Sequence, residues 1–138
     1  MYYGALEAGG TKMVCAIGDA DKNIIDRISI PTGTPDQSVP AMIDYFKKYD
    51  ISALGIGTFG PADINPNSPT YGSIMRSPKK DWEGFSLYKA FTDALGCLVV
   101  VDTDVNAAAW GEYLYGALKG LNSGMYLTVG TGIGGGII

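Results

Sequence analysis

The sequence contains no histidine and only two cysteines among its 138 residues. Without histidine, the chain offers no imidazole to act as a general base or to bind a metal ion. The cysteines, Cys15 and Cys97, stand far apart in apolar runs, and neither belongs to a C-x-x-C pair. We therefore expect two buried, reduced thiols in strands rather than a zinc or redox site.

Charge is also scarce, and its balance is acidic. Charged residues make up 17% of the chain, and ten basic against 14 acidic residues leave a net charge of −4. This balance argues against a surface that binds nucleic acid or anionic membranes. No apolar run approaches the roughly 18 residues that a transmembrane helix needs, and the first residues show no secretion signal. We therefore expect a cytoplasmic protein without nucleic-acid or membrane partners.

Glycine is in excess, at 20 of 138 positions, and apolar residues amount to 46%, enough for a hydrophobic core. Three short strand-like runs at the start, joined by tight turns, are typical of an antiparallel meander. A capping box from Thr34 to Gln37 begins a helix, in which Pro40 predicts a bend or a late start. The run 98–101 is typical of a strand buried on both faces. The elements expected, in order, are strands 2–7, 13–18 and 23–30, helix 34–49, strand 51–58, helix 86–95, strand 98–101, helix 103–120 and strand 125–129.

These elements predict an α/β fold with a mixed sheet flanked by helices. The end of the chain then repeats its beginning, because strand 125–129 is followed by glycines and by Ile137-Ile138, which resembles a returning strand. This repetition predicts one whole domain over residues 1–120 and the first hairpin of a second, related domain over 121–138. We therefore expect the chain to be one part of a longer protein.

Two glycine-rich segments could approach a phosphate. Gly9-Gly10-Thr11-Lys12 offers backbone N–H groups, a hydroxyl and a positive charge, although a tight hairpin with a solvated lysine explains this turn alone more simply. The segment 130–136 contains G-x-G-x-x-G after a strand. Strand residues follow it where a dinucleotide site needs a helix, so a hairpin near a phosphate or a sugar is the better explanation.

A third segment places Asp104 between a strand and a helix of small residues. The carboxyl end of a strand is where α/β sheets bind ligands, and a carboxylate there can accept a proton from a substrate hydroxyl. An aspartate at this position is also expected for helix capping and for the helix dipole. For this segment taken alone, that structural explanation is the simpler one.

Taken together, four segments resemble the ROK family of bacterial sugar kinases. They are 7–12, 57–61, 103–112 and 130–134, in the order and spacing of that family. The stretch Ser68-Pro69-Thr70-Tyr71-Gly72, together with Ser77-Pro78-Lys79 and Trp82, resembles the fructokinase branch. The Asn-Leu pair usual in glucokinase-like members is missing near the latter position. The resemblance implies an actin-like, ribonuclease H-like fold in which two related domains close over ATP and a sugar.

The activity that the resemblance implies is that of an ATP-dependent hexose kinase, above all a fructokinase that forms the 6-phosphate. A glucose or mannose kinase of the same family is one alternative. A non-enzymatic sugar-sensing transcriptional regulator is another, although such regulators carry a helix-turn-helix ahead of the kinase-like part. The resemblance also implies a homodimer.

The family's site residues can be placed on matching positions of this chain. Asp104 would be the general base, and Glu7 would hold the water shell of a Mg²⁺ ion. The residues that would bind ATP phosphates are Gly9, Gly10, Thr11, Lys12, Gly130, Thr131 and Gly132. The residues that would bind the sugar are Thr58, Gly60, Pro61, Thr103 and Asp104. The family's zinc ligands and adenosine pocket would lie after position 138, so no zinc site is expected in this chain.

Overall fold

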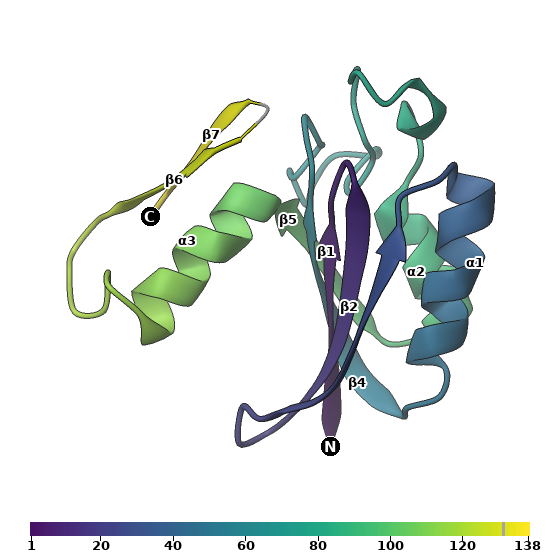
Figure 1. Cartoon of the computed structure of the whole chain (residues 1–138), viewed down its shortest axis with the longest axis horizontal. Coiled ribbons are helices and arrows are strands. Elements are labelled where there is room, and N and C mark those ends of the chain that lie inside the picture. The colour runs from purple at the N-terminus through teal and green to yellow at the C-terminus, as the bar shows by residue number, and fades with distance from the viewer. Residues whose placement is uncertain (131) are drawn as a thin grey trace.

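The computed structural model describes residues 1–130 and 132–138. Its centre is a five-stranded mixed sheet with the order β3-β2-β1-β4-β5 (Figure 1). β1, β2 and β3 form the expected antiparallel meander, while β4 and β5 run parallel to β1. The strands are β1 Tyr2–Ala8, β2 Lys12–Asp19, β3 Ile24–Pro31, β4 Ile51–Thr58 and β5 Leu98–Thr103. The expected mixed sheet is therefore confirmed.

Helices cover both faces of this sheet (Figure 1). α1 (Pro35–Phe46) and α2 (Leu87–Leu95) lie on one face, and α3 (Asp104–Tyr115) lies on the other. The core forms between the sheet and the first two helices, where large apolar side chains are fully buried. Its largest members are Trp82, Phe46, Phe91, Met13, Ile17, Met42 and Leu54. Among the described residues, no helix is long and apolar enough to cross a membrane.

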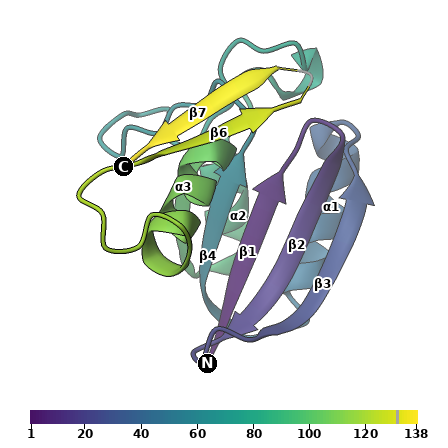
Figure 2. The ribbon, with the colours of Figure 1, turned by 60° about the vertical axis from the view of Figure 1, so that its left-hand side comes forward.

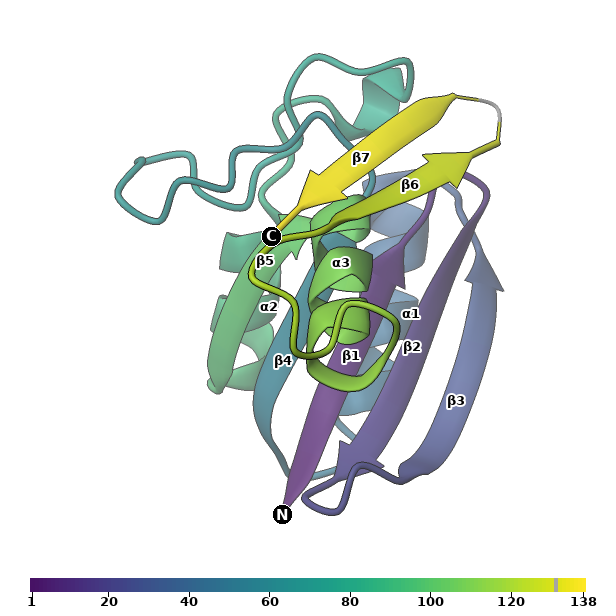
Figure 3. The same cartoon turned by 90° about the vertical axis from the view of Figure 1, so that its left-hand side faces the viewer.

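The last two strands form a separate antiparallel pair, β6 (Met125–Val129) and β7 (Ile133–Ile137). This hairpin crosses over α3 rather than joining the central sheet (Figures 2 and 3). The contact is close, because a Cβ added to Gly136 would lie 2.2 Å from the Val105 carbonyl oxygen. The returning strand ends at Ile137 and begins at Ile133, four residues earlier than expected.

The helix α1 begins at Pro35, so the late start predicted from Pro40 is wrong. The Gln37 side chain accepts the Thr34 N–H at 3.1 Å, as the capping box predicts. Pro40 lies inside the helix with its ring exposed. The helix tolerates the missing N–H because its opposite side buries apolar residues in the core, among them Met42 and Phe46.

Three further expectations are corrected at the far end of the sheet. β5 is buried on one face only: Val99 and Val101 point into the core, whereas Leu98 and Val100 on the other face remain 66% and 53% exposed. Cys97 lies before β5 and is half-buried, whereas Cys15 is buried as expected and burial raises its thiol pKa to about 12.

α3 ends at Tyr115 instead of near residue 120, and the Glu112 carboxylate accepts the Ala117 N–H just beyond that end.

Candidate functional site

A cavity of about 650 Å³ opens at the carboxyl ends of the parallel strands. The β1–β2 turn, the segments that follow β4 and β5, and the β6–β7 hairpin surround it. The predicted site residues that line it are Gly10, Thr11, Gly60, Thr103, Asp104, Gly130 and Gly132. Four segments far apart in the sequence therefore share one space.

The other predicted residues lie outside the wall of this cavity. Thr58 is fully buried, and its hydroxyl donates to the Phe59 carbonyl at 3.0 Å. Gly9, Lys12 and Pro61 are direct neighbours of lining residues. Glu7 lines a smaller adjoining cavity together with Asp104. Thr131 lies outside the described residues.

The turn between β1 and β2 is held in place by Thr32, which follows β3. Its hydroxyl donates to the Gly9 carbonyl at 2.7 Å, and its N–H donates to the Thr11 carbonyl at 3.0 Å. The N–H groups of Gly10 and Thr11 donate to no acceptor within residues 1–130 and 132–138. A turn whose carbonyls are occupied and whose N–H groups are free can accept an anion.

The structure shows which side chains cap the start of α3. The N-cap of α3 is Thr103, whose hydroxyl accepts the Asn106 N–H at 3.2 Å. The Asp102 carboxylate accepts the Thr103 N–H and the Asn106 side-chain amide, both at 2.7 Å. The start of α3 is therefore capped without Asp104.

Asp104 itself is half-buried and lines the main cavity. Its Oδ1 atom accepts the N–H of Val105 at 2.9 Å. Its Oδ2 atom accepts no hydrogen bond from the part of the chain that is described. One carboxylate oxygen thus remains available to a ligand, which is the requirement for a general base.

Gly57 allows α3 to approach the sheet closely enough to place Asp104. A Cβ added to Gly57 would lie 3.0 Å from the Ala107 Cβ and 3.5 Å from the Asp104 Cα. A Cβ added to Gly55, two residues earlier in the same strand, would meet nothing within 4 Å. The position of Asp104 therefore depends on the absence of a side chain at Gly57.

We expect Gly57→Val to displace α3 and Gly55→Val to leave it in place. A shift of about 1 Å in a reacting group can lower a rate by around 100-fold, so any catalytic rate that depends on Asp104 is expected to fall at least about tenfold in Gly57→Val. Steady-state kinetics of both variants test this. Equal kcat values for the two variants would contradict the role assigned to Gly57.

Sequence reasoning missed one part of the cavity wall, the segment Ser77, Pro78 and Lys79. Ser77 is buried, and its hydroxyl accepts the Lys79 N–H at 3.0 Å. The segment leads into a short 3₁₀ helix (Lys80–Trp82), in which the Trp82 indole N–H donates to the Gly33 carbonyl at 2.9 Å. The resemblance of residues 77–79 and Trp82 to one branch of the family was the available signal.

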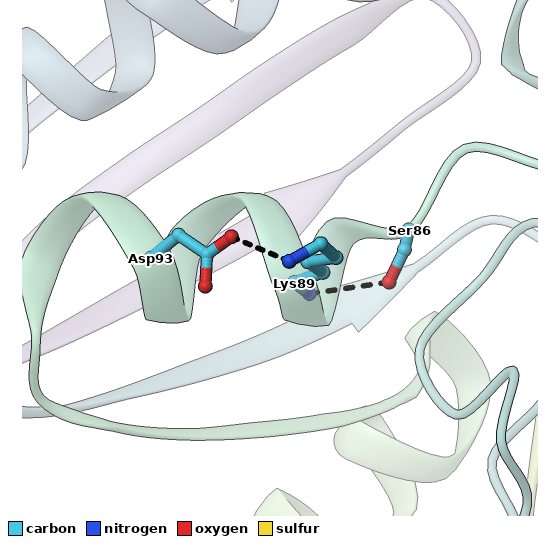
Figure 4. A network of polar contacts seen from close by, with 3 residues as sticks. All are labelled: Ser86, Lys89 and Asp93. Carbon is cyan, nitrogen blue, oxygen red and sulfur yellow. Dashed lines mark hydrogen bonds and ion pairs between the residues drawn. The ribbon is translucent and has the colours of Figure 1, made fainter.

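A second cavity of about 630 Å³ lies between α2 and the loop over residues 66–73. Polar groups beside it form a network local to the helix (Figure 4). Lys89 pairs with Asp93 at 2.8 Å, and the Lys89 N–H donates to the Ser86 hydroxyl at 3.1 Å. The Asp93 carboxylate raises the pKa of Lys89. These contacts cap and stabilise α2, so they do not indicate a catalytic site.

Comparison with known families and proteins relates the chain to sugar kinases. A model described as the ROK family matches residues 3–138. A fructokinase of Lactococcus lactis is 46% identical over 138 residues, which cover 100% of this chain and 47% of that protein. A fructokinase of Pediococcus pentosaceus is 44% identical over 138 residues, which cover 100% of the chain and 48% of that protein.

Solved structures show the same relationship. The structure of a ROK family glucokinase from Streptomyces griseus, in complex with glucose and AMPPNP, matches with a TM-score of 0.83 at 32% sequence identity. The match covers 100% of this chain and 44% of that one. The chain thus spans about half the length of the relatives that it matches.

Proposed function

Because the chain belongs to the ROK family, we propose that the protein is an ATP-dependent hexose kinase that forms fructose 6-phosphate. Its sheet and helices have the actin-like fold of the solved ROK kinases. The observation that carries the proposal is the shared cavity, in which a carboxylate with a free oxygen faces two glycine-rich turns. Fructose is favoured because fructokinases match at 44–46% identity.

In this proposal, Asp104 is the general base. Its free Oδ2 accepts the proton of the sugar 6-hydroxyl while the oxygen of that hydroxyl attacks the γ-phosphorus of ATP. A new O–P bond forms, the bond between the γ-phosphorus and the bridging oxygen breaks, and ADP leaves with the electron pair. Phosphoryl transfer needs mainly positioning and neutralisation of charge, and the N–H groups of Gly10 and Thr11 supply part of both.

The sugar is proposed to lie between Asp104 and the segment that follows β4. Gly60 and Thr103 line the cavity on this side and would contact the sugar hydroxyls. Thr58 is buried, so its role is to order the turn that carries Gly60 and Pro61 rather than to touch the sugar. The remaining phosphate contacts are proposed for Gly9 and Lys12 in the first turn and for residues 130–132 in the second.

The acidic residues fit Mg²⁺ but not zinc. Mg²⁺ is usually held by one or two carboxylates, water and substrate phosphates, and the Glu7 side chain is exposed in a cavity that it shares with Asp104. We propose that Glu7 holds the water shell of Mg²⁺, which would neutralise phosphate charge. The described residues contain no cluster of three metal-ligating side chains, and both cysteines are isolated. We therefore derive no step through zinc.

The proposal extends to the organisation of the protein. Residues 1–120 would form the first kinase domain, and the β6–β7 hairpin over residues 121–138 would open the second. The separate pairing of β6 with β7 supports this division. The whole protein is proposed to act as a cytoplasmic homodimer.

An assay of the full-length gene product tests the activity. We expect ATP, Mg²⁺ and fructose to give ADP and fructose 6-phosphate in equal amounts, with a higher kcat/KM for fructose than for glucose or mannose. The measurement is ADP release together with chromatographic identification of the sugar phosphate. ADP release that does not depend on sugar would contradict the proposal, and specific retention of DNA without turnover would favour a regulator.

A further inference from the structure

Lys79 lies where an anion bound at the first glycine turn would need a positive charge. A Cβ added to Gly10 would lie 3.6 Å from the Lys79 Cε atom, so the lysine side chain passes over this turn. Among the described residues that line the main cavity, only Lys79 and Asp104 carry a charge. The cavity therefore combines one cation with one carboxylate.

Two contacts fix the backbone from which Lys79 projects. The buried Ser77 hydroxyl accepts the Lys79 N–H at 3.0 Å. Three residues beyond Lys79, the fully buried Trp82 packs edge-on against Phe59, with ring centroids 6.0 Å apart, and donates to the Gly33 carbonyl. Because the backbone is fixed both before and after Lys79, the side chain is better positioned to meet a ligand than a lysine on a mobile loop.

The neighbouring lysine has a different environment. Lys80 forms an ion pair with Glu83 at 3.5 Å on the surface. Lys79 makes no ion pair with any residue that the structure describes. A lysine whose Cε lies beside the first glycine turn, and which has no carboxylate partner among the described residues, suits a phosphoryl group. Its positive charge and the free N–H groups of the turn both attract oxyanions.

We propose that Lys79 binds the phosphoryl group during its transfer and retains it on the newly formed sugar phosphate. This inference rests on the proposed kinase function and adds a residue to it. Asp104 would take the proton of the sugar hydroxyl, and Lys79 would neutralise the oxygens of the group that the sugar receives. The lysine distinguishes fructose 6-phosphate from fructose, because only the phosphate carries the charge that it recognises.

Lys79→Met in the full-length protein tests this role, with Lys80→Met as the matched control. We expect kcat to fall on the order of 10- to 100-fold, as when one charge-stabilising donor is removed from an active site. Product inhibition by fructose 6-phosphate should weaken about tenfold, while KM for fructose changes less than about threefold. Lys79→Arg should recover part of kcat, because it restores the charge.

Three outcomes would overturn the assignment of Lys79. They are a kcat and product inhibition within about threefold of the wild type, an equal loss in Lys80→Met, and no recovery in Lys79→Arg. A wild-type protein that phosphorylates no sugar would instead contradict the proposed function. In that case, titration calorimetry with inorganic phosphate still tests Lys79, since equal binding by the wild type and Lys79→Met would exclude it as a phosphate ligand.

Discussion

Asp104→Asn in the full-length protein is expected to lower kcat by on the order of 100-fold or more, as the loss of a general base does. The asparagine oxygen can still accept the Val105 N–H that Asp104 Oδ1 accepts at 2.9 Å. The amide nitrogen, however, would take the place of the free Oδ2 atom and cannot accept a proton. Steady-state kinetics with ATP and fructose measure the loss of kcat.

Asp102→Asn is the matched control, two residues away at the start of the same helix. Asp102 uses a single oxygen, Oδ1, to accept both the Thr103 N–H and the Asn106 amide. An asparagine oxygen can accept both bonds, so kcat is expected to stay within about tenfold of the wild type. If the two variants lose the same activity, the negative charge at the helix N-terminus rather than proton transfer explains the effect.

Trp82→Ala is expected to lower the free energy of unfolding by about 3–5 kcal/mol, the cost of removing a large aromatic side chain from a core. Trp82 is 1% exposed and packs edge-on against Phe59 and Phe85. Its loss would also leave the Gly33 carbonyl without its indole donor. Because typical domains are stable by only about 5–15 kcal/mol, this variant is expected to lose a large fraction of its stability.

The chain offers a matched control in its second tryptophan. Trp110 is 47% exposed on α3, so Trp110→Ala should cost less than about 1 kcal/mol. Trp82→Phe keeps a ring but loses the hydrogen bond, and should cost about 1–3 kcal/mol. Urea unfolding followed by circular dichroism measures all three variants. Equal midpoints for Trp82→Ala and Trp110→Ala would contradict the structural role of Trp82.

Much of the fold follows from local sequence. The antiparallel meander, the helix α1 and the helix α2 lie close to the ranges that residue patterns predict. The Gln37 side chain accepts the N–H of Thr34, only three residues away, and tight turns join the first strands. These features therefore depend only on near neighbours. The four segments of the site were also recognisable, because each forms a short continuous run.

Errors arose where the outcome depended on distant residues. Residues 98–101 of β5 are all apolar, yet one face of the strand stays open and leaves Leu98 and Val100 exposed. The cap of α3 could be assigned to Thr103 and Asp102 only after the partners of Asn106 were known, so the sequence alone left capping open as an explanation of Asp104. Lys79 was missed as a site residue because it lies 69 positions from Gly10 in the sequence.

The sequence by itself determined most of the strands and helices, the family and the polar groups available to a ligand. Tertiary structure decided which of those groups share a cavity. Secondary structure and capping arise from interactions over a few residues, which a local pattern records. A site forms when long-range contacts, such as that between Trp82 and Gly33, bring separate segments together. Close packing then fixes the relative positions of these segments, and no short segment of sequence specifies them.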